Sequence, residues 1–565
     1  MDEQGKVFPG ARSAPMLARP EGCFNRSVFK SMGYSDSDLA KPLIGIANAW
    51  SEAVPGHMNL RQLAELVKRG ICAAGGTPVE FGVLGACDGT GQGNEGMKYM
   101  LPHRDLVAHS VEVMVEAHRL DAVVMLGSCD KIVPGMLMAA ARLGVPAILL
   151  PGGPMLGGIE FDGRETDLTS TTEAVGMLKK GIIGEDDFAG LEEGCSPTCG
   201  SCSFLGTANT MCCLAEALGM TLPHGALTPA VYADRLRLAQ KTGEAIVALA
   251  KKTYVPILSH ASLRNAIRVL NAIGGSTNAV MHLTAIAAEL EIPSLMEDFR
   301  MIPDEVPQIV KVNPSSKYNM EHFHLAGGMP QVLRELRPLL ELDVPAVTGG
   351  TLGEQIDAGP AFPRVNRAII RPLSDPFAPR GGIAILQGNL SPATCVTKPA
   401  AIHPDQHCFT GTAIVFDAEE TAEEAILAGR VSAGDVVVIR YEGPKGGPGM
   451  REMFKAMKYL YGMGLGTTTA VVTDGRFSGT NNGCFVGHVS PEAAEGGPIA
   501  VVRDGDRITI DIPSRTLTLH VDEAEIETRM RDWKRPPFKF RKGYLALYER
   551  LAASADKGAV LRCEI

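Results

Sequence analysis

The first 150 residues alternate between short apolar runs and longer segments in which apolar residues recur with helical spacing. The apolar runs are 43–50, 81–87, 121–129 and 147–150, and the helical segments are 61–74, 106–119 and 135–143. Strands that alternate with helices are typical of parallel β-α-β units. The pattern therefore predicts an α/β fold in which a parallel sheet is covered by helices.

From about residue 370 the pattern changes to short β-rich runs. They are 382–387, 411–416, 434–441, 468–474, 499–512 and 516–521. The sequence Asp-Gly-Asp at 504–506 lies between two alternating segments and predicts a hairpin. We expect a β-rich, barrel-like second domain, with the boundary near the prolines of 360–372, so that the domains are 1–365 and 366–565.

Composition and charge exclude several classes of protein. The chain has 565 residues, with 54 basic and 64 acidic side chains and a net charge of −10. This balance does not favour nucleic acid as a partner, because phosphate binding requires clustered Lys and Arg. No window reaches the roughly 18–20 apolar residues of a membrane span, and the first residues lack a signal core. We expect a cytoplasmic protein with no membrane partner.

Two predicted strands end in unusual tripeptides. Cys87-Asp88-Gly89 follows one, and Cys129-Asp130-Lys131 follows another. In open α/β sheets ligands bind beyond the carboxyl ends of the strands, and a soft thiolate beside a hard carboxylate suits neighbouring soft and hard metals. In the alternative interpretation Cys129 is a packing residue, Asp130 caps the next helix and Lys131 is solvated.

The 13 cysteines include one dense group. The segment Cys195–Cys202 has C-x₃-C-x₂-C spacing, which lets one loop present two or three thiolates to iron or zinc. The pair at 212–213 lies in a helix-like stretch and is expected to be core. No Cys or His pair follows at the spacing of a zinc finger, so an iron–sulfur cluster that recruits Cys129 is the leading hypothesis, with a zinc-stabilised binding protein as an alternative.

Two glycine-rich segments are weaker signals. Residues 91–96 match G-x-G-x-x-G, the dinucleotide-binding pattern, but Pro102 and His103 intervene before the next helix and the expected acidic residue is missing. A nicotinamide oxidoreductase is therefore a minor hypothesis. The turn at 474–480 follows an apolar run and could hold the Ser478 hydroxyl at the mouth of the second domain.

Taken together, the motifs resemble those of the dihydroxy-acid and phosphogluconate dehydratase family, and the likeness covers nearly the whole chain. The matching stretches are PGHMNL (55–60), CDGTGQGNEGM (87–97), CDKIVPGMLMAA (129–140), PTCGSCSFLGTANTM (197–211), GGSTNAVMHL (274–283), AGGMP (326–330), GGPGMREM (446–453), DGRFSG (474–479) and GHVSPEAAEGGP (487–498).

The resemblance implies a hydro-lyase that removes water from a 2,3-dihydroxy carboxylic acid to give a 2-oxo acid, using an iron–sulfur cluster and Mg²⁺. It implies the following site residues: Cys129 and Cys202 as cluster ligands; Asp88, Asp130, Glu452 and a carbamylated Lys131 as Mg²⁺ ligands; Ser478 as the base. The cation would withdraw charge and acidify the C2 proton, and Ser478 would take that proton as an alkoxide.

The sequence departs from the family pattern at one cluster position. Members with a two-iron cluster carry a third cysteine where this chain has Gly56, so [4Fe–4S] is favoured over [2Fe–2S], with Cys199 or Cys87 as the third ligand. The segments 541–560 and 475–494 favour 2,3-dihydroxy-3-methylbutanoate and its ethyl homologue, of branched-chain amino-acid synthesis, as substrates. Gly206 favours the alternative, an aldonate such as xylonate, arabinonate or gluconate. The family also implies a homodimer or homotetramer.

Overall fold

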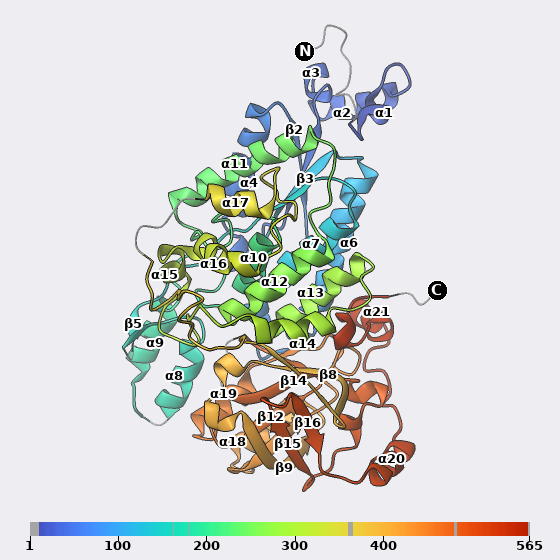
Figure 1. The fold of residues 1–565 in the computed structure, drawn as a ribbon. Coiled ribbons are helices and arrows are strands. Elements are labelled where there is room, and N and C mark those ends of the chain that lie inside the picture. The colour runs from blue at the N-terminus through green and yellow to red at the C-terminus, as the bar shows by residue number, and fades with distance from the viewer. Residues whose placement is uncertain (1–10, 162, 180, 360–364, 480–482, 563–565) are drawn as a thin grey trace.

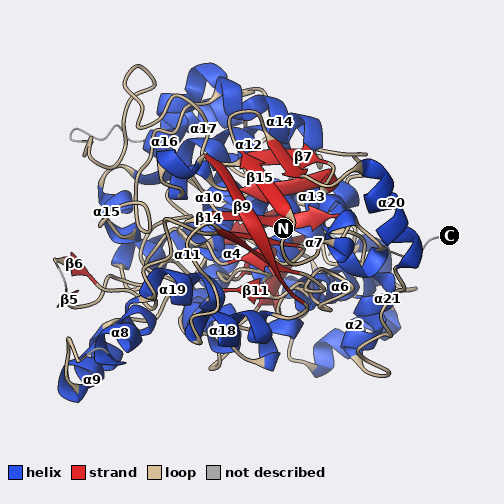
Figure 2. Ribbon diagram, turned by 90° about the horizontal axis from the view of Figure 1, so that it is seen from below, coloured by secondary structure: helices blue, strands red, loops and turns tan. Residues whose placement is uncertain are grey.

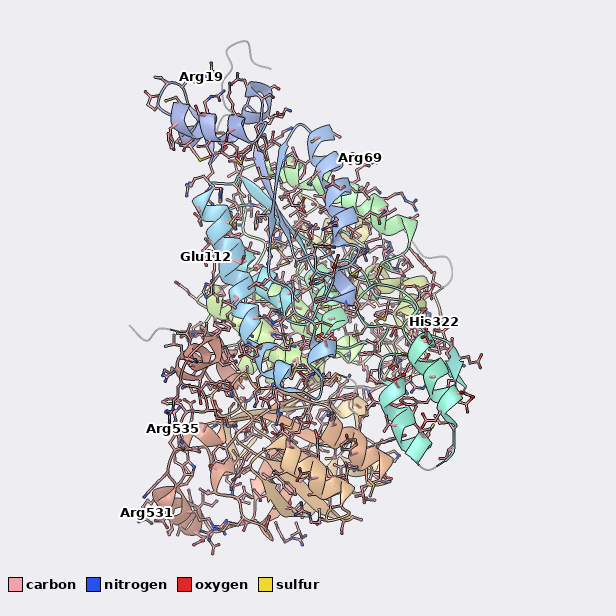
Figure 3. All side chains as sticks on the ribbon, turned by 180° about the vertical axis from the view of Figure 1, so that it is seen from behind. Arg19, Arg69, Glu112, His322, Arg531 and Arg535 are labelled. Atoms are coloured by element: carbon pink, nitrogen blue, oxygen red, sulfur yellow. The ribbon has the colours of Figure 1, made fainter. Side chains whose placement is uncertain are left out.

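The computed structural model describes residues 11–562 apart from 162, 180, 360–364 and 480–482. Figure 1 shows an α/β domain followed by a β-rich domain, and in Figure 3 Arg19, near the start of the chain, and Arg531 lie at opposite ends of the molecule. The predicted boundary near 360–372 lies partly outside the described residues, and the division into 1–365 and 366–565 stays a prediction. Within the described residues, none of the helices is long and apolar enough to cross a membrane.

A parallel four-stranded sheet forms the centre of the first domain. Its order is β2-β1-β3-β4, with bounds Thr77–Gly82, Leu43–Asn48, Ala122–Leu126 and Ala147–Leu150. Every residue of β1, β3 and β4 is buried, as expected for strands covered by helices on both faces. The predicted parallel α/β fold is confirmed. The apolar run at 81–87 is not a strand throughout, because β2 ends at Gly82 and the remaining residues lead into the candidate site.

Helices surround this sheet. Those that cover it or support the site are α4 (Leu60–Ala73), α6 (Pro102–Ala117), α7 (Ile132–Arg142), α10 (Thr207–Ala217), α11 (Ala233–Ala250), α12 (His260–Ile273) and α13 (Asn278–Glu289). Apart from the two helices of the arm described next, the other α-helices described in this half are α1 (Ala14–Leu17), α2 (Cys23–Ser31), α3 (Asp36–Leu39), α5 (Asp88–Gly91), α14 (Met296–Glu305), α15 (Met320–Leu325), α16 (Gly328–Leu336) and α17 (Leu352–Ala358). The proline at 102, expected to delay the helix, is its first residue, where a missing N–H has no cost.

A helical arm projects from the first domain. It contains the short strands β5 (Glu160–Phe161) and β6 (Arg164–Glu165) and the helices α8 (Ser170–Lys179) and α9 (Glu185–Gly194), and Figures 1 and 2 show it standing out from the body. At its base His322 of α15 lies 3.8 Å from Glu165, close to the arm in Figure 3. The arm ends where the cysteine-rich loop begins.

The second domain is a closed eight-stranded barrel, as the β-rich pattern predicts. The strand order is β10-β12-β14-β8-β7-β16-β15-β9. In chain order the bounds are β7 Ala384–Gly388, β8 Ser391–Thr397, β9 Cys408–Phe416, β10 Asp435–Ile439, β12 Ala470–Thr473, β14 Cys484–Ser490, β15 Arg507–Asp511 and β16 Thr516–Leu519. Around it lie α18 (Glu419–Leu427), α19 (Lys455–Gly462), α20 (Glu523–Asp532) and α21 (Tyr544–Leu551).

The hairpin predicted at 504–506 is wrong. Residues 498–501 form a 3₁₀ helix whose side chains Ile499, Ala500 and Val501 pack into the barrel core, so the turn joins a helix to β15 rather than two strands. The hairpin in this region is formed by β15 and β16, which pair antiparallel with Ile508 opposite Leu519. An alternating pattern of only a few residues fits either structure, and tertiary packing decides between them.

The two domains are joined by contacts far from the boundary. The Arg104 guanidinium of α6 is fully buried and donates to the carbonyls of Gly558 and Ala559, near the end of the chain. The Tyr544 hydroxyl of α21 donates to the carbonyl of Pro102. The C-terminal segment thus returns to the first domain and closes against it.

Candidate active site

Neighbouring strands of the parallel sheet end at one edge, and their loops form the floor of the site. The loop after β1 carries Gly56 and His57, the loop after β2 carries Cys87 and Asp88, and residues 129–131 lie between β3 and α7. Parallel strands place their carboxyl ends together, so the two tripeptides noted in the sequence meet beside β1. The contacts described below bring these strand ends together, and their role in a site stays a prediction.

The second domain contributes a two-stranded parallel sheet. It consists of β11 (Glu452–Met453) and β13 (Arg476–Phe477), with Glu452 opposite Arg476 and Met453 opposite Phe477. Ser478 follows β13 directly, and its backbone N–H donates to the carbonyl of Met453 at 3.3 Å. This small sheet therefore brings Glu452, Arg476 and Ser478 to the first domain as one unit.

Carboxylates from both domains converge. Ligand oxygens of Asp88, Asp130 and Glu452 all lie within 4.8 Å of one another. Lys131 lies among them, with Nζ 2.6 Å from Asp88 Oδ2, 3.3 Å from Asp130 Oδ2 and 3.8 Å from Glu452 Oε2. Arg476 forms an ion pair with Glu452 and lies 3.8 Å from Asp88 Oδ2. Because Lys131 is completely buried, the alternative in which it is solvated is wrong.

The charges of this cluster shift the acidities of its members. Burial acts to raise the pKa of Asp88, but the Lys131 and Arg476 cations outweigh it and hold the pKa below its usual value. Burial raises the pKa of Asp130 to about 6, against the opposing effect of Lys131. Asp88 Oδ1 is buried and has no hydrogen-bond partner among the described residues. A buried carboxylate oxygen of this kind is suited to ligate a divalent cation.

Three of the four candidate cluster cysteines lie together. The interaction between the neighbouring thiols of Cys87 and Cys129 lowers the pKa of Cys87 to about 7, and the same interaction together with burial raises the pKa of Cys129 well above its usual value. Burial raises the pKa of Cys202, and the charges of Asp130 and Cys87 raise it further. A Cβ placed on Gly56 would lie 3.0 Å from Cys129 Sγ, so position 56 also faces this group.

Backbone contacts hold Cys202 in place. Ser201 N–H donates to the Gly153 carbonyl after β4, Met155 N–H donates to the Ser201 carbonyl, and the Asn209 amide donates to the Cys202 carbonyl. A sharp turn at Gly200 separates Cys199 from Cys202. The φ of Gly200 is 137°, and a Cβ there would lie 2.3 Å from the backbone nitrogen of Met155, so only glycine fits. Burial raises the pKa of Cys199, and in the described part of the chain no other cysteine contributes to that shift.

The cysteine pair at 212–213 and the glycine-rich segment 91–96 lie in surroundings that do not suggest a further site. Cys212 and Cys213 are buried in α10, as expected of core residues. The glycine-rich segment 91–96 does not open a long helix: α5 ends at Gly91 and a 3₁₀ helix follows at Glu95–Tyr99. Within this segment the Gly93 carbonyl accepts a hydrogen bond from the Lys455 ammonium of the second domain. This geometry does not support the dinucleotide hypothesis.

Sequence reasoning missed two residues that contact the carboxylates. Arg476 lies inside the quoted motif DGRFSG, yet nothing in the sequence distinguishes a buried arginine from a solvated one. Asn278, in the motif GGSTNAVMHL, donates to Glu452 Oε2 at 3.0 Å. An amide beside apolar residues at a helix start gives no signal of such a contact.

Comparison with known proteins places these residues in a family. The model for the dihydroxy-acid/6-phosphogluconate dehydratase N-terminal domain matches residues 41–355, and the corresponding C-terminal model matches 368–559. A dihydroxy-acid dehydratase of Caldanaerobacter subterraneus is 51% identical over 542 residues, covering 95% of this chain and 97% of that protein. Dihydroxy-acid dehydratases of Acetivibrio thermocellus (49%) and Pyrococcus furiosus (48%) cover the same shares of the two chains. The protein belongs to the dihydroxy-acid/6-phosphogluconate dehydratase family and is a hydro-lyase.

Proposed function

We propose that the protein dehydrates 2,3-dihydroxy-3-methylbutanoate and 2,3-dihydroxy-3-methylpentanoate to the corresponding 2-oxo acids, a reaction of branched-chain amino-acid synthesis. The observation that carries this proposal is the meeting of three carboxylates, from both domains, with three thiols at the same sheet edge. The dihydroxy-acid dehydratases described above, about half identical along almost the whole chain, support the choice of substrate.

Asp88, Asp130 and Glu452 would hold Mg²⁺, which when bound would ligate the substrate carboxylate and 2-hydroxyl and acidify the C2 proton. Asp88 Oδ1, which has no partner among the residues that the structure describes, fits this role. An ammonium group at Lys131 does not fit a Mg²⁺ site, because it pairs with the same carboxylates and its positive charge would repel the ion. Addition of CO₂ to the neutral amine forms an N–C bond and releases one proton. The product is a carbamate on Nζ, whose anionic oxygens can ligate Mg²⁺. We therefore keep Lys131 in the ligand set in its carbamylated form.

Cys129, Cys202 and Cys87 would hold an iron–sulfur cluster, which when bound would supply a Lewis acid for the 3-hydroxyl as it leaves. Soft thiolates are the usual ligands of such clusters, and the contact between Cys87 and Cys129 supports Cys87 over Cys199 as the third ligand. With three protein thiolates as ligands, a [4Fe–4S] cluster would keep one iron for the Lewis-acid role. Glycine at position 56, facing Cys129, is consistent with this arrangement rather than with [2Fe–2S].

Ser478 would act as the base. The hydrogen bond from its N–H to Met453 fixes the residue beside the sheet that carries Glu452 and Arg476, so two positive charges, Arg476 and the bound cation, would favour its alkoxide. The alkoxide takes the C2 proton and the C3–O bond breaks, and the departing hydroxide takes up a proton and leaves as water while the proton on Ser478 returns to solvent. The resulting enol loses the proton of its 2-hydroxyl, gains one at C3 and becomes the 2-oxo acid.

One observation favours an aldonate as the second candidate substrate. Gly206, the residue that resembles the sugar-acid branches, packs against the turn of the base: a Cβ on Gly479 would lie 3.0 Å from Gly206 Cα. A Cβ on Gly206 itself would lie 2.8 Å from the Phe204 ring, so a larger residue at this position would displace that ring beside the Ser478 turn.

The deciding experiment is an anaerobic assay of 2-oxo acid formation by protein reconstituted with iron, sulfide and Mg²⁺. We expect kcat/KM for 2,3-dihydroxy-3-methylbutanoate to exceed that for xylonate, arabinonate and gluconate by at least about 10-fold, since a polyol carries hydroxyls that an apolar pocket leaves unpaired. A preference for any aldonate would establish the second candidate. Absence of 2-oxo acid from every substrate would contradict the proposed function.

A further inference from the structure

Asn278 connects the two domains at the candidate active site. It is the first residue of α13 in the first domain and is completely buried. Its amide nitrogen lies 3.0 Å from Glu452 Oε2, 3.4 Å from the Phe477 carbonyl and 3.0 Å from Thr207 Oγ1. Glu452 and Phe477 belong to the second domain, 174 and 199 positions further along the chain.

The orientation of the amide follows from its neighbours. A carboxylate and a backbone carbonyl can only accept hydrogen bonds, so the NH₂ group has to face Glu452 and Phe477. Turning the amide over would place its oxygen against two acceptors. The Thr207 hydroxyl can still accept from Asn278, because it lies 2.8 Å from Ser276 Oγ and can donate there.

The two acceptors lie on the two strands of the small parallel sheet of the second domain. Glu452 lies on β11 and Phe477 on β13, and Ser478 is the next residue after Phe477. Asn278, from the first domain, thus donates both to a carboxylate of the candidate Mg²⁺ site and to the last residue of the strand that precedes Ser478. The adjacent Arg476 also binds Glu452 within the same small sheet, and among the described residues it reaches the first domain only by longer contacts, 3.8 Å to Asp88 Oδ2 and 3.9 Å to Met97 Sδ.

We propose that Asn278 is a positioning residue. It fixes the direction of the Glu452 carboxylate relative to Asp88 and Asp130, and it fixes the position of β13, and so of the following Ser478, relative to the candidate Mg²⁺ site. This inference rests on the proposed function for the role of Ser478, although the effect on the carboxylates does not depend on the substrate. Hydrogen bonds to a ligating carboxylate fix its direction, and their loss usually lowers metal affinity or activity by about 10- to 100-fold.

The test compares Asn278→Ala with Asn271→Ala. Asn271 is also a fully buried asparagine that bonds across the two halves of the chain, since its Oδ1 accepts from the Ile383 N–H at 3.3 Å, but it has no contact with the carboxylates among the described residues. Mn²⁺ alone is titrated into each protein and free Mn²⁺ is followed by electron paramagnetic resonance. We expect Asn278→Ala to weaken Mn²⁺ binding by about 10-fold or more and to lower kcat by a similar factor with little change in KM. Asn271→Ala should bind Mn²⁺ like the unmodified protein.

A second variant guards against a folding defect. Asn278→Ser keeps a hydrogen-bond donor in a smaller side chain, so its Mn²⁺ affinity should lie between those of Asn278→Ala and the unmodified protein. Mn²⁺ affinity within twofold of the unmodified protein in both variants would overturn the proposal, as would an equal loss in Asn271→Ala. If the unmodified protein formed no 2-oxo acid, the proposed function would fail, while the Mn²⁺ comparison would still decide the role of Asn278.

Discussion

Replacing Lys398 by methionine is expected to stabilise the protein. Lys398 follows β8, is 2% exposed, and its ammonium has no hydrogen-bond partner among the described residues. Burial lowers its pKa from 10.5 to about 8. Buried charges without a partner are unfavourable, and methionine has nearly the same shape without the charge.

The size and pH dependence of the effect follow from that pKa. A difference of this size between the unfolded and folded states corresponds to roughly 3 kcal/mol of unfolding free energy, as an upper estimate. Below a pH of about 8 both states of Lys398 are protonated, so the folded protein carries the full penalty. Between about 8 and 10.5 the folded state loses its proton first, the unfolded state holds more protons, and stability rises with pH.

The measurement is the difference in thermal unfolding midpoint between Lys398→Met and the unmodified protein at about pH 7 and about pH 10. We expect a gain of several degrees at the lower pH, since 1 kcal/mol shifts the midpoint of a domain of about 200 residues by roughly 2–4 °C, and a much smaller gain at the higher pH. Lys311→Met, at an exposed lysine, should change stability by less than about 0.5 kcal/mol at both. An unchanged or lower midpoint at about pH 7, or a gain independent of pH, would refute the reasoning.

Three further predictions concern the candidate site. Ser478→Ala should retain the visible absorbance of the cluster and bind Mn²⁺ normally but lose turnover by about 10²-fold or more, and retained turnover in the 2-oxo acid assay would remove Ser478 from the role of base. Cys87→Ser should lower the iron and sulfide content after anaerobic reconstitution while Cys199→Ser leaves it unchanged; the reverse result would make Cys199 the third ligand. Lys131→Met removes the site of carbamylation, so Mn²⁺ titrations should show weaker binding that added bicarbonate does not improve, whereas bicarbonate should strengthen binding to the unmodified protein.

Much of the fold could be predicted because the signals are local. The runs at 43–50 and 147–150 are continuous apolar stretches of strand length, and they became fully buried parallel strands. The segment at 61–74 has the spacing of an amphipathic helix and became α4. Where a local pattern fits two structures, as at 504–506, packing against the barrel decided the outcome and the prediction was wrong.

The site could be predicted only where one segment carries the chemistry. Cys87-Asp88 and Cys129-Asp130-Lys131 each place unusual residues at a strand end, and the sheet brings them together. The contacts of Asn278 depend instead on how the two domains pack. A lysine in a segment with the sequence TKPAA is ordinarily expected in solvent, and its burial without an acceptor is visible only in the folded protein.

The buried charges explain why both domains are needed for the site. The first domain supplies Asp88, Asp130 and Lys131, whose charges sum to −1 when Lys131 is an ammonium, and β11 and β13 add Glu452 and Arg476, whose charges cancel. Separating the domains would leave Glu452 without its contact to Asn278 and Asp88 without Arg476 nearby. Breaking a buried ion pair by removing one partner costs several kcal/mol, because the other charge loses its compensation. The interactions that bring the carboxylates Asp88, Asp130 and Glu452 together therefore also stabilise the interface between the domains.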